Sequence, residues 1–178
     1  MKEELSSALD ILRQAIRIEQ DGHKMYLEAA ERTTDAQGKR MFRSLVQDEQ
    51  EHMRILQNEY QALNSTGKWI TMDKAKSKEP PEAVLVLFPR EEGAGGRITS
   101  EDTTDLEALQ LAMDFEKRGY EMYQKASETS NLDAQALYRY LAKEENKHFT
   151  LLQKTYEYLS QKGSWLFDDL EKPHFAAP

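Results

Sequence analysis

The sequence contains no cysteine, and this absence excludes several kinds of metal or redox site within the chain. Disulfides, thiolate zinc sites, iron–sulfur clusters and a rubredoxin-type iron centre all require cysteine sulfur. Long apolar runs are missing as well: the longest, Ala83–Phe88, is far shorter than the roughly 20 residues of a membrane-spanning helix. The N-terminus reads MKEEL and carries no apolar signal region, so we expect a cytoplasmic protein.

Glycine and proline are scarce, and acidic residues outnumber basic ones. The 178 residues include 8 glycines and 5 prolines, and the net charge at pH 7 is −8. An acidic surface repels nucleic acids and anionic membranes, so neither is expected as a partner. Charged residues make up 31% of the chain and hydrophobic residues 39%. This mixture is typical of long amphipathic helices, and the length suits a single domain over residues 1–178.

An internal repeat organises the chain. Its first half contains the segments EQDGHKMY, LVQDEQEH and LNSTGKW, at residues 19–26, 45–52 and 63–69. Its second half contains, in the same order, EKRGYEMY, LAKEENKH and LSQKGSW, at residues 116–123, 141–148 and 159–165. Two helical segments with matching exits, present twice, predict two helical hairpins in tandem.

Helix-breaking and helix-capping residues predict the limits of four helices. The helices are expected at about residues 4–32, 35–63, 104–128 and 131–160. The candidate caps are Thr34 or Asp35 for the second helix, Thr104 with Glu107 for the third, and Asn131 for the fourth. Short loops within each pair favour antiparallel hairpins, so we expect an all-α four-helix bundle.

A long crossover, residues 64–103, is expected to join the two hairpins. It contains three closely spaced prolines and the segment GAGG at 93–96, so it cannot form one helix. The apolar run Ala83–Phe88 is interpreted as a short strand or an apolar tether on the bundle. Residues 161–178 form a tail that we expect to pack on a helix or a neighbouring subunit through Phe167, Leu170 and Phe175.

Each predicted helix has an inward apolar stripe that is interrupted at mid-length by a carboxylate. The interrupting residues are Glu19, Glu49, Glu116 and Glu145. A buried carboxylate without a partner costs several kcal/mol, and four of them close together also repel one another. No Lys or Arg lies at the same level of these stripes. Two divalent cations would balance the four negative charges, so the sequence predicts a pair of metal ions.

The spacing of two histidines supports this prediction. Glu49-x-x-His52 and Glu145-x-x-His148 place a Glu and a His on adjacent turns of one helix, where both can reach one ion. One Glu from each of two helices, plus Glu-x-x-His from each of the others, is the ligand arrangement of di-iron carboxylate bundles. We therefore predict six metal ligands: Glu19, Glu49, His52, Glu116, Glu145 and His148.

With Glu19-x6-Tyr26 followed by DEQEH at residues 48–52, the sequence resembles the rubrerythrin family of the ferritin-like superfamily. The resemblance covers both hairpins and implies a ferritin-like bundle with two iron ions at the six ligands. It further implies reduction of hydrogen peroxide or O2, or oxidation of Fe(II), as iron cycles between Fe2+ and Fe3+. An external electron donor, such as a separate rubredoxin or a reductase, is implied too. Manganese or a mixed iron–manganese pair stays open as the native metal.

Two departures from the family pattern leave other functions open. Rubrerythrins usually carry a C-terminal rubredoxin domain, which this chain cannot build without cysteine, and an extra carboxylate where this sequence has Arg118 or Gly119. The remaining ligand set resembles the ferroxidase centre of bacterioferritin, but Gln50 replaces the expected haem-binding methionine, so no haem is predicted. An iron-handling ferroxidase and a structural helical module with a vestigial site stay as alternatives. The long crossover and the tail favour a homodimer over a hollow shell.

Residues beside the ligands are candidates for supporting roles. Asp48 and Glu144 each precede a ligand glutamate and can accept the outward N–H of His148 and His52, respectively, or be exposed helix charges. Candidate catalytic residues are Tyr26 and Tyr123, which can hydrogen-bond a ligand carboxylate, take part in redox chemistry or simply pack in the core. The remaining candidates are His23, as an extra ligand or a hydrogen-bonded core residue, and Gly22 and Gly119, which mark a close helix approach or room for ligand movement.

Overall fold

The computed structural model describes residues 2–77, 79 and 103–165. This part of the chain forms five helices and no strand: α1 (Lys2–Arg32), α2 (Ala36–Thr66), α3 (Met72–Ser77), α5 (Asp105–Thr129) and α6 (Leu132–Lys162). The prediction of an all-α fold is therefore confirmed. The four long helices lie within a few residues of their predicted ranges, and α2 and α6 each continue slightly past their predicted ends.

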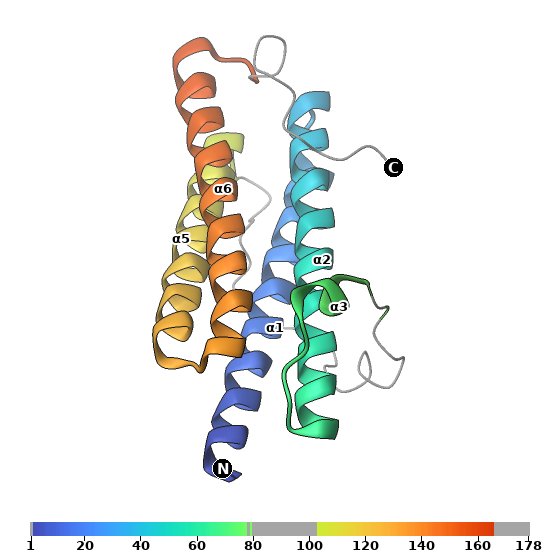
Figure 1. Cartoon of the computed structure of the whole chain (residues 1–178). Coiled ribbons are helices and arrows are strands. Elements are labelled where there is room, and N and C mark those ends of the chain that lie inside the picture. The colour runs from blue at the N-terminus through green and yellow to red at the C-terminus, as the bar shows by residue number, and fades with distance from the viewer. Residues whose placement is uncertain (1, 78, 80–102, 166–178) are drawn as a thin grey trace.

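The long helices form two antiparallel hairpins that pack side by side (Figure 1). α1 packs along α2, and α5 packs along α6. α1 and α6 run in one direction along the bundle, whereas α2 and α5 run in the other. Because α2 ends at the opposite end of the bundle from the start of α5, the connection between the hairpins has to cover the length of the bundle. This is the topology of a four-helix bundle with one long crossover.

Side-chain caps begin three of the long helices. Asp35, rather than Thr34, caps α2, because its Oδ1 accepts hydrogen bonds from two backbone N–H groups of the first turn at 2.7 and 3.0 Å. Thr104 and Glu107 form a complete capping box at the start of α5. Asn131 Oδ1 caps α6 by accepting a first-turn backbone N–H at 3.0 Å. These caps satisfy backbone donors that have no partner within the helix.

A short helix, α3, lies in the segment where the sequence predicts an irregular crossover. Ala75 is fully buried, and Asn58 Nδ2 on α2 donates to the Ala75 carbonyl oxygen at 2.8 Å. Arg54 donates to the carbonyl oxygen of Lys76. The beginning of the crossover is thus tied to α2. The interpretations of Ala83–Phe88 and of the tail residues Phe167, Leu170 and Phe175 concern positions outside the described residues.

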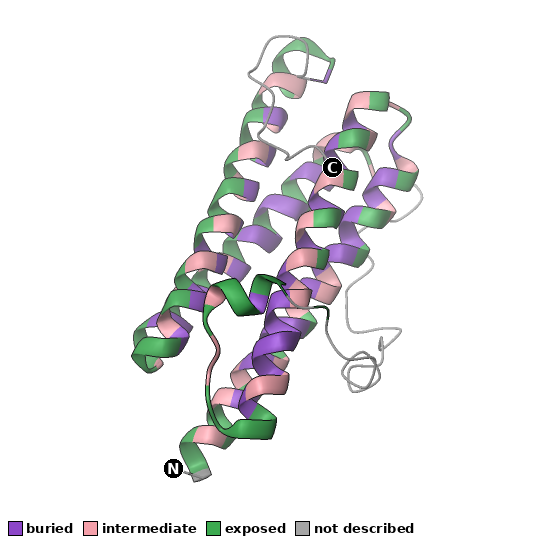
Figure 2. Cartoon of the chain, turned by 45° about the vertical axis from the view of Figure 1, so that its right-hand side comes forward, coloured by how far each residue is buried: buried purple, intermediate pink, exposed green. Residues whose placement is uncertain are grey.

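Two apolar clusters fill the bundle, one toward each end, and the buried stripes of the helices face each other (Figure 2). One cluster includes Leu12, Leu56, Tyr123 and Leu137, and the other includes Tyr26, Phe42, Leu109 and Leu152. Along every long helix, one mid-length glutamate lies between the two clusters. The apolar core therefore positions a polar layer at the middle of the bundle.

One tryptophan lies in an apolar cluster, and another packs against the other cluster. Trp69 packs edge-on against Tyr138 with ring centroids 6.3 Å apart, and Trp165 packs edge-on against Phe42 at 5.8 Å. A Cβ on Gly38 would come within 2.6 Å of the Trp165 ring, so the absence of a side chain at that position makes room for the indole. Both rings extend the apolar core toward an end of the bundle.

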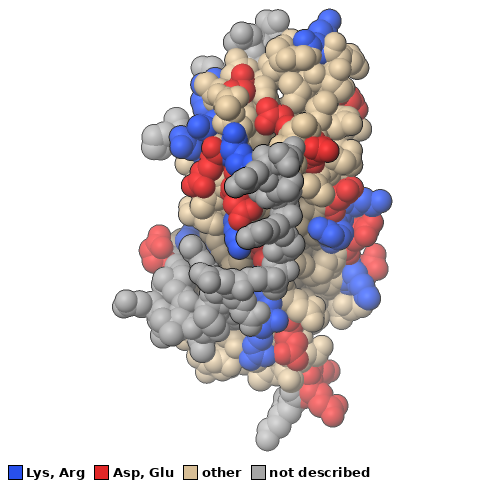
Figure 3. Space-filling view, turned by 180° about the vertical axis from the view of Figure 1, so that it is seen from behind, with Lys and Arg blue, Asp and Glu red and all other residues tan. Residues whose placement is uncertain are grey.

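The outward faces of the helices are charged. On the face seen in Figure 3, acidic and basic side chains are interspersed rather than gathered by sign. Ion pairs with N–O distances of 2.7, 2.6 and 2.8 Å join residues three apart on one helix: Asp10–Arg13, Glu51–Arg54 and Glu144–Lys147. Among the described residues, no helix has the length and apolar character needed to cross a membrane.

Candidate metal centre

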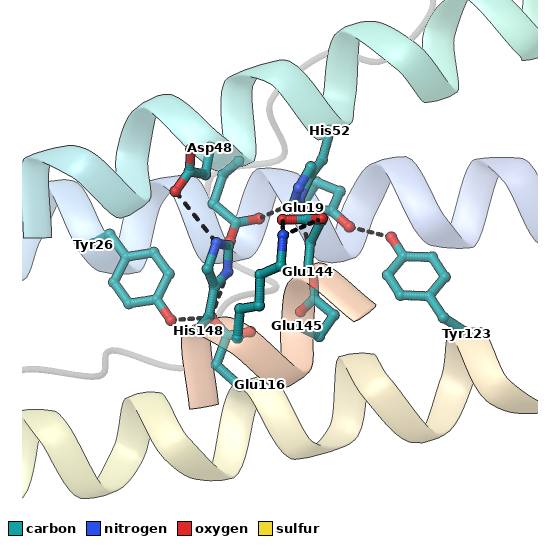
Figure 4. Close-up of polar contacts among 11 residues, drawn as sticks. Glu19, Tyr26, Asp48, His52, Glu116, Tyr123, Glu144, Glu145 and His148 are labelled. Atoms are coloured by element: carbon teal, nitrogen blue, oxygen red, sulfur yellow. Dashed lines mark hydrogen bonds and ion pairs between the residues drawn. The ribbon is translucent and has the colours of Figure 1, made fainter. Parts of the chain in front are cut away.

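Four glutamates and two histidines meet in the polar layer (Figure 4). They come from all four long helices, and they are the six residues for which the sequence predicts metal binding: Glu19, Glu49, His52, Glu116, Glu145 and His148. None is more than 5% exposed. Steps of three and four residues keep each of them in line with the apolar stripe of its helix, so packing of the core brings all six inward.

The six side chains form two groups of four that share Glu49 and Glu145. One group adds Glu19 and His52 to the shared pair, and the other adds Glu116 and His148. Within each group, one ligand atom from every residue lies within 4.8 Å of the others. Four donor atoms at this spacing can surround one ion. Two such groups with two carboxylates in common would suit a pair of metal ions.

Two tyrosines connect the hairpins across this centre. The Tyr26 hydroxyl on α1 donates to Oε1 of Glu116 on α5, and the Tyr123 hydroxyl on α5 donates to Oε1 of Glu19 on α1. Burial, followed by the charge of the glutamate that each one contacts, raises the pKa of both hydroxyls well above the usual value. Both hydroxyls therefore stay protonated and donate. Hydrogen bonding to a candidate ligand, left open by the sequence, is present at both positions.

Several polar atoms of the centre are buried and have no hydrogen-bond partner in the part of the chain that the structure describes. They are Oε1 and Oε2 of Glu49, Oε2 of Glu116, Oε1 of Glu145 and Nδ1 of His148. An unsatisfied buried polar atom costs about 1–3 kcal/mol, so five in one place require an explanation. Carboxylate oxygens and imidazole nitrogens are the donors that iron and manganese take in proteins. The residues present therefore fit a metal pair.

A family model described as rubrerythrin matches residues 10–156, a range that contains all six candidate ligands. The chain belongs to the rubrerythrin family. Among solved structures, it is similar to a hypothetical protein from Pyrococcus furiosus, with 23% sequence identity and a TM-score of 0.62. That alignment covers 86% of this chain and 90% of the other, and it supports the fold alone. A comparison with curated proteins finds no match.

Rubrerythrins bind two iron ions, and the buried carboxylate and histidine cluster of this family member can hold metal ions. Burial, followed by the charge of Glu19, raises the pKa of Glu49 well above its usual range. Burial, followed by the charge of Glu116, does the same to the pKa of Glu145. Burial alone would lower the pKa of His148, but neighbouring carboxylates, Glu116 first, raise it well above the usual value. The buried carboxylates of the centre therefore favour the binding of protons or of metal cations.

Two glycines of the chain make room for the shared carboxylates. A Cβ on Gly119 would lie 2.6 Å from Oε2 of Glu145. A Cβ on Gly22 would lie 3.2 Å from Oε2 of Glu49 and 2.9 Å from the Phe115 ring. Each glycine is on the first helix of its hairpin, facing the shared glutamate of the second. At both positions the atoms nearest to the missing side chain include the carboxylate of a candidate ligand, and none of them belongs to the backbone of a neighbouring helix.

The outward partners predicted for the two histidines differ in outcome. Oδ2 of Asp48 lies 3.4 Å from Nε2 of His148, so this predicted pairing is present. The predicted pairing of Glu144 with His52 is wrong. Both carboxylate oxygens of Glu144 instead accept from Lys147 Nζ at 2.8 Å. Lys147 lies one turn further along α6, and its exposed ammonium competes with His52 for the half-buried carboxylate.

Positions 118 and 119, where this chain departs from the rubrerythrin pattern, hold Arg and Gly and so add no carboxylate to the described centre. Arg118 is exposed, with its guanidinium carbon 5.9 Å from the centroid of the Phe115 ring. The space beside Gly119 is taken by the carboxylate of Glu145. Nε2 of His23 lies 3.0 Å from Nε2 of Gln50, and His23 belongs to neither four-residue group. His23 is thus a hydrogen-bonded core residue, the second of its two predicted roles.

Proposed function

We propose that this protein is a non-haem di-iron oxidoreductase of the rubrerythrin type that reduces hydrogen peroxide or O2. The observation that carries the proposal is the pair of four-residue groups sharing Glu49 and Glu145. Glu19 and His52 would complete the ligands of one ion, and Glu116 and His148 those of the other. The donors are oxygen and imidazole nitrogen, which suit iron and also allow manganese.

The burial of the six residues adapts the centre to electron transfer to a small oxidant. When bound, the iron pair supplies two electrons, one from each Fe(II), so that hydrogen peroxide and two protons become two water molecules. The apolar clusters on both sides limit the entry of water and strengthen electrostatic interactions inside the centre. An external donor, such as a separate rubredoxin or a reductase, would return the electrons, because the chain has no cysteine for a rubredoxin domain.

Tyr26 and Tyr123 are proposed to orient the ligands and to hold protons beside the centre. Each hydroxyl fixes Oε1 of a glutamate on the other hairpin, and Oε2 of that glutamate takes no part in this hydrogen bond. Oε2 of Glu19 lies 3.1 Å from Nδ1 of His52, and Oε2 of Glu116 is buried with no hydrogen-bond partner among the described residues. Changing both tyrosines to phenylalanine should slow iron oxidation by about tenfold or more while leaving the helix content unchanged.

Anaerobic loading with Fe(II), followed by rapid mixing with hydrogen peroxide, tests the proposal. We expect binding of about two Fe(II) per chain and oxidation that peroxide stimulates. The double variant Glu49→Ala, Glu145→Ala should lose this oxidation, whereas Glu121→Ala, on an exposed helix face, should keep it. Oxidation that survives loss of both shared carboxylates would rule the centre out. Metal-free protein that stays folded and binds no iron would favour a structural module with a vestigial site.

Iron handling is the second candidate, in which the same centre oxidises Fe(II) for storage or transfer. The observation that favours it concerns α5, where the extra carboxylate of rubrerythrins is absent at positions 118 and 119. Arg118 is exposed, and the Glu145 carboxylate fills the space beside Gly119. A storage protein needs a hollow oligomer, whereas we expect a homodimer. The native mass distinguishes these, because each chain contributes 20.6 kDa. A shell-sized particle, together with faster oxidation by O2 than by peroxide, would favour storage.

A further inference from the structure

The two histidines of the centre have similar inner surroundings. Nδ1 of His52 lies 3.1 Å from Oε2 of Glu19, and Nδ1 of His148 lies 3.4 Å from Oε1 of Glu49 and 3.5 Å from Oε1 of Glu116. Both rings therefore turn Nδ1 toward the carboxylates, and their centroids are 5.6 Å apart. This leaves Nε2 of each ring for an outward partner.

The outward surroundings of the two histidines are different. Nε2 of His148 lies 3.4 Å from Oδ2 of Asp48, which comes from the other hairpin and has a side chain that is 41% exposed (Figure 4). His52 instead packs edge-on against the Tyr140 ring, with centroids 6.3 Å apart. The Lys76 ammonium of α3 lies 3.8 Å from the centroid of that same ring. Among the described residues, Nε2 of His148 thus has a carboxylate beside it, whereas the His52 ring has an aromatic neighbour on which a Lys ammonium lies.

The repeat makes this difference informative. Glu144 occupies the position in the second hairpin that Asp48 occupies in the first. Its carboxylate is held by Lys147 through both oxygens, so it is not available to His52. The outer sides of the two histidines, which a simple duplication would make alike, therefore differ in charge.

We propose that Asp48 makes the two metal positions unequal, so that the position built from Glu116 and His148 binds a divalent ion more tightly than the position built from Glu19 and His52. A carboxylate at Nε2 fixes the tautomer that has its proton on Nε2 and leaves Nδ1 free to bind metal. The carboxylate also makes the imidazole more basic, so that Nδ1 is a stronger electron-pair donor to the metal ion. The inference rests on the metal pair of the proposed function, and it assigns Asp48 as a positioning residue.

Calorimetric titration with Co2+ tests the inference without relying on enzyme activity, and the visible absorption of bound Co2+ gives a second readout. Asp48→Ala should weaken the tighter Co2+ binding step by about 10–100-fold, the usual effect of losing the outer partner of a ligand histidine. Asp48→Asn should have a smaller effect, because its amide oxygen still accepts the N–H without carrying charge. Glu144→Ala, at the matched position, should change neither step.

A double-mutant cycle identifies the histidine through which Asp48 acts. The effect of Asp48→Ala should persist in a His52→Ala background and disappear in a His148→Ala background. An equal effect in both backgrounds, an equal effect of Glu144→Ala, or no effect of Asp48→Ala on a protein that binds two Co2+ would overturn the inference while leaving the metal pair in place. A wild-type chain that binds no Co2+ and no Fe(II) would overturn both. Because the Asp48 side chain is partly exposed, we expect all variants at this position to fold.

Discussion

Glu49→Gln should stabilise the protein without metal and destabilise it with metal. Glu49 is 1% exposed, and neither of its carboxylate oxygens has a hydrogen-bond partner among residues 2–77, 79 and 103–165. Burial and the charge of Glu19 raise the pKa of Glu49 well above 4.5. The folded chain therefore penalises the charged form of Glu49, and glutamine has the same shape without the charge.

The free-energy cost of keeping Glu49 charged in the folded chain has an upper limit, because the carboxyl group can bind a proton instead. At pH 7, a carboxyl group with an ordinary pKa of 4.5 can lose its charge by binding a proton, at about 1.4 kcal/mol per pH unit. The free-energy penalty at pH 7, about 2.5 pH units above this pKa, therefore cannot exceed about 3.5 kcal/mol, which corresponds to about 10 °C in Tm for a chain of this size. Because the pKa in the folded state lies above that in the unfolded state, the penalty grows as pH rises above about 4.5 and disappears below it.

Thermal unfolding followed by circular dichroism, in chelator and in excess Co2+, measures this effect. In chelator, Glu49→Gln should melt above the wild type at pH 7 and close to it at about pH 5. In Co2+ the order should reverse, since a metal stabilises only the folded chain that binds it. Glu121→Gln makes the same chemical change on an exposed face and should shift stability by less than about 0.5 kcal/mol. A Glu49→Gln variant that melts below the wild type in chelator at pH 7 would refute the reasoning.

Three further predictions concern packing, titration and capping. Gly119→Ala should reduce Co2+ affinity at least tenfold in calorimetry, because its Cβ would lie 2.6 Å from Oε2 of Glu145. The stability of the metal-free protein should change by less than about 2 kcal/mol, since the better helix propensity of alanine opposes the crowding. Burial raises the pKa of Glu59 to about 7, so the charged form of Glu59 increasingly destabilises the folded wild type as pH rises. In urea unfolding, the free energy of unfolding of Glu59→Gln should therefore rise relative to that of the wild type by up to about 3 kcal/mol between pH 5 and pH 8. Asp35→Ala should cost about 1 kcal/mol in the same assay, whereas Thr34→Ala should cost less than half as much, because Asp35 alone of the two caps α2.

The six residues of the centre were predictable because they break a regular pattern twice. Each glutamate interrupts an apolar stripe at mid-length, and each Glu-x-x-His occurs at the matching place in both copies of the repeat. The helix ends were predictable for a similar reason, since capping side chains act on backbone groups within one turn. Features that depend on neighbours along one helix are visible in a sequence.

Features that depend on contacts between helices, or on competition between side chains, were less predictable. Glu144 has the same place in the repeat as Asp48, yet Lys147 holds its carboxylate, and the sequence alone does not rank these partners. Helix α3 has six residues and only Ala75 buried, too little for a periodic pattern to show. The role of Gly119 required the position of the Glu145 carboxylate on the next helix.

The crossed tyrosine–glutamate hydrogen bonds carry a consequence for how such a chain can evolve. Each hairpin gives one tyrosine and receives one, as Tyr26 with Glu116 and Tyr123 with Glu19 show, and this exchange is the pattern of a twofold symmetric pairing. A pair of separate, identical hairpins could make the same contacts, but every substitution in it would appear twice. Covalent fusion removes that constraint, so one half can change alone. The two halves already differ in this way, because Asp48 lies beside His148 whereas Glu144 at the matching position is paired with Lys147.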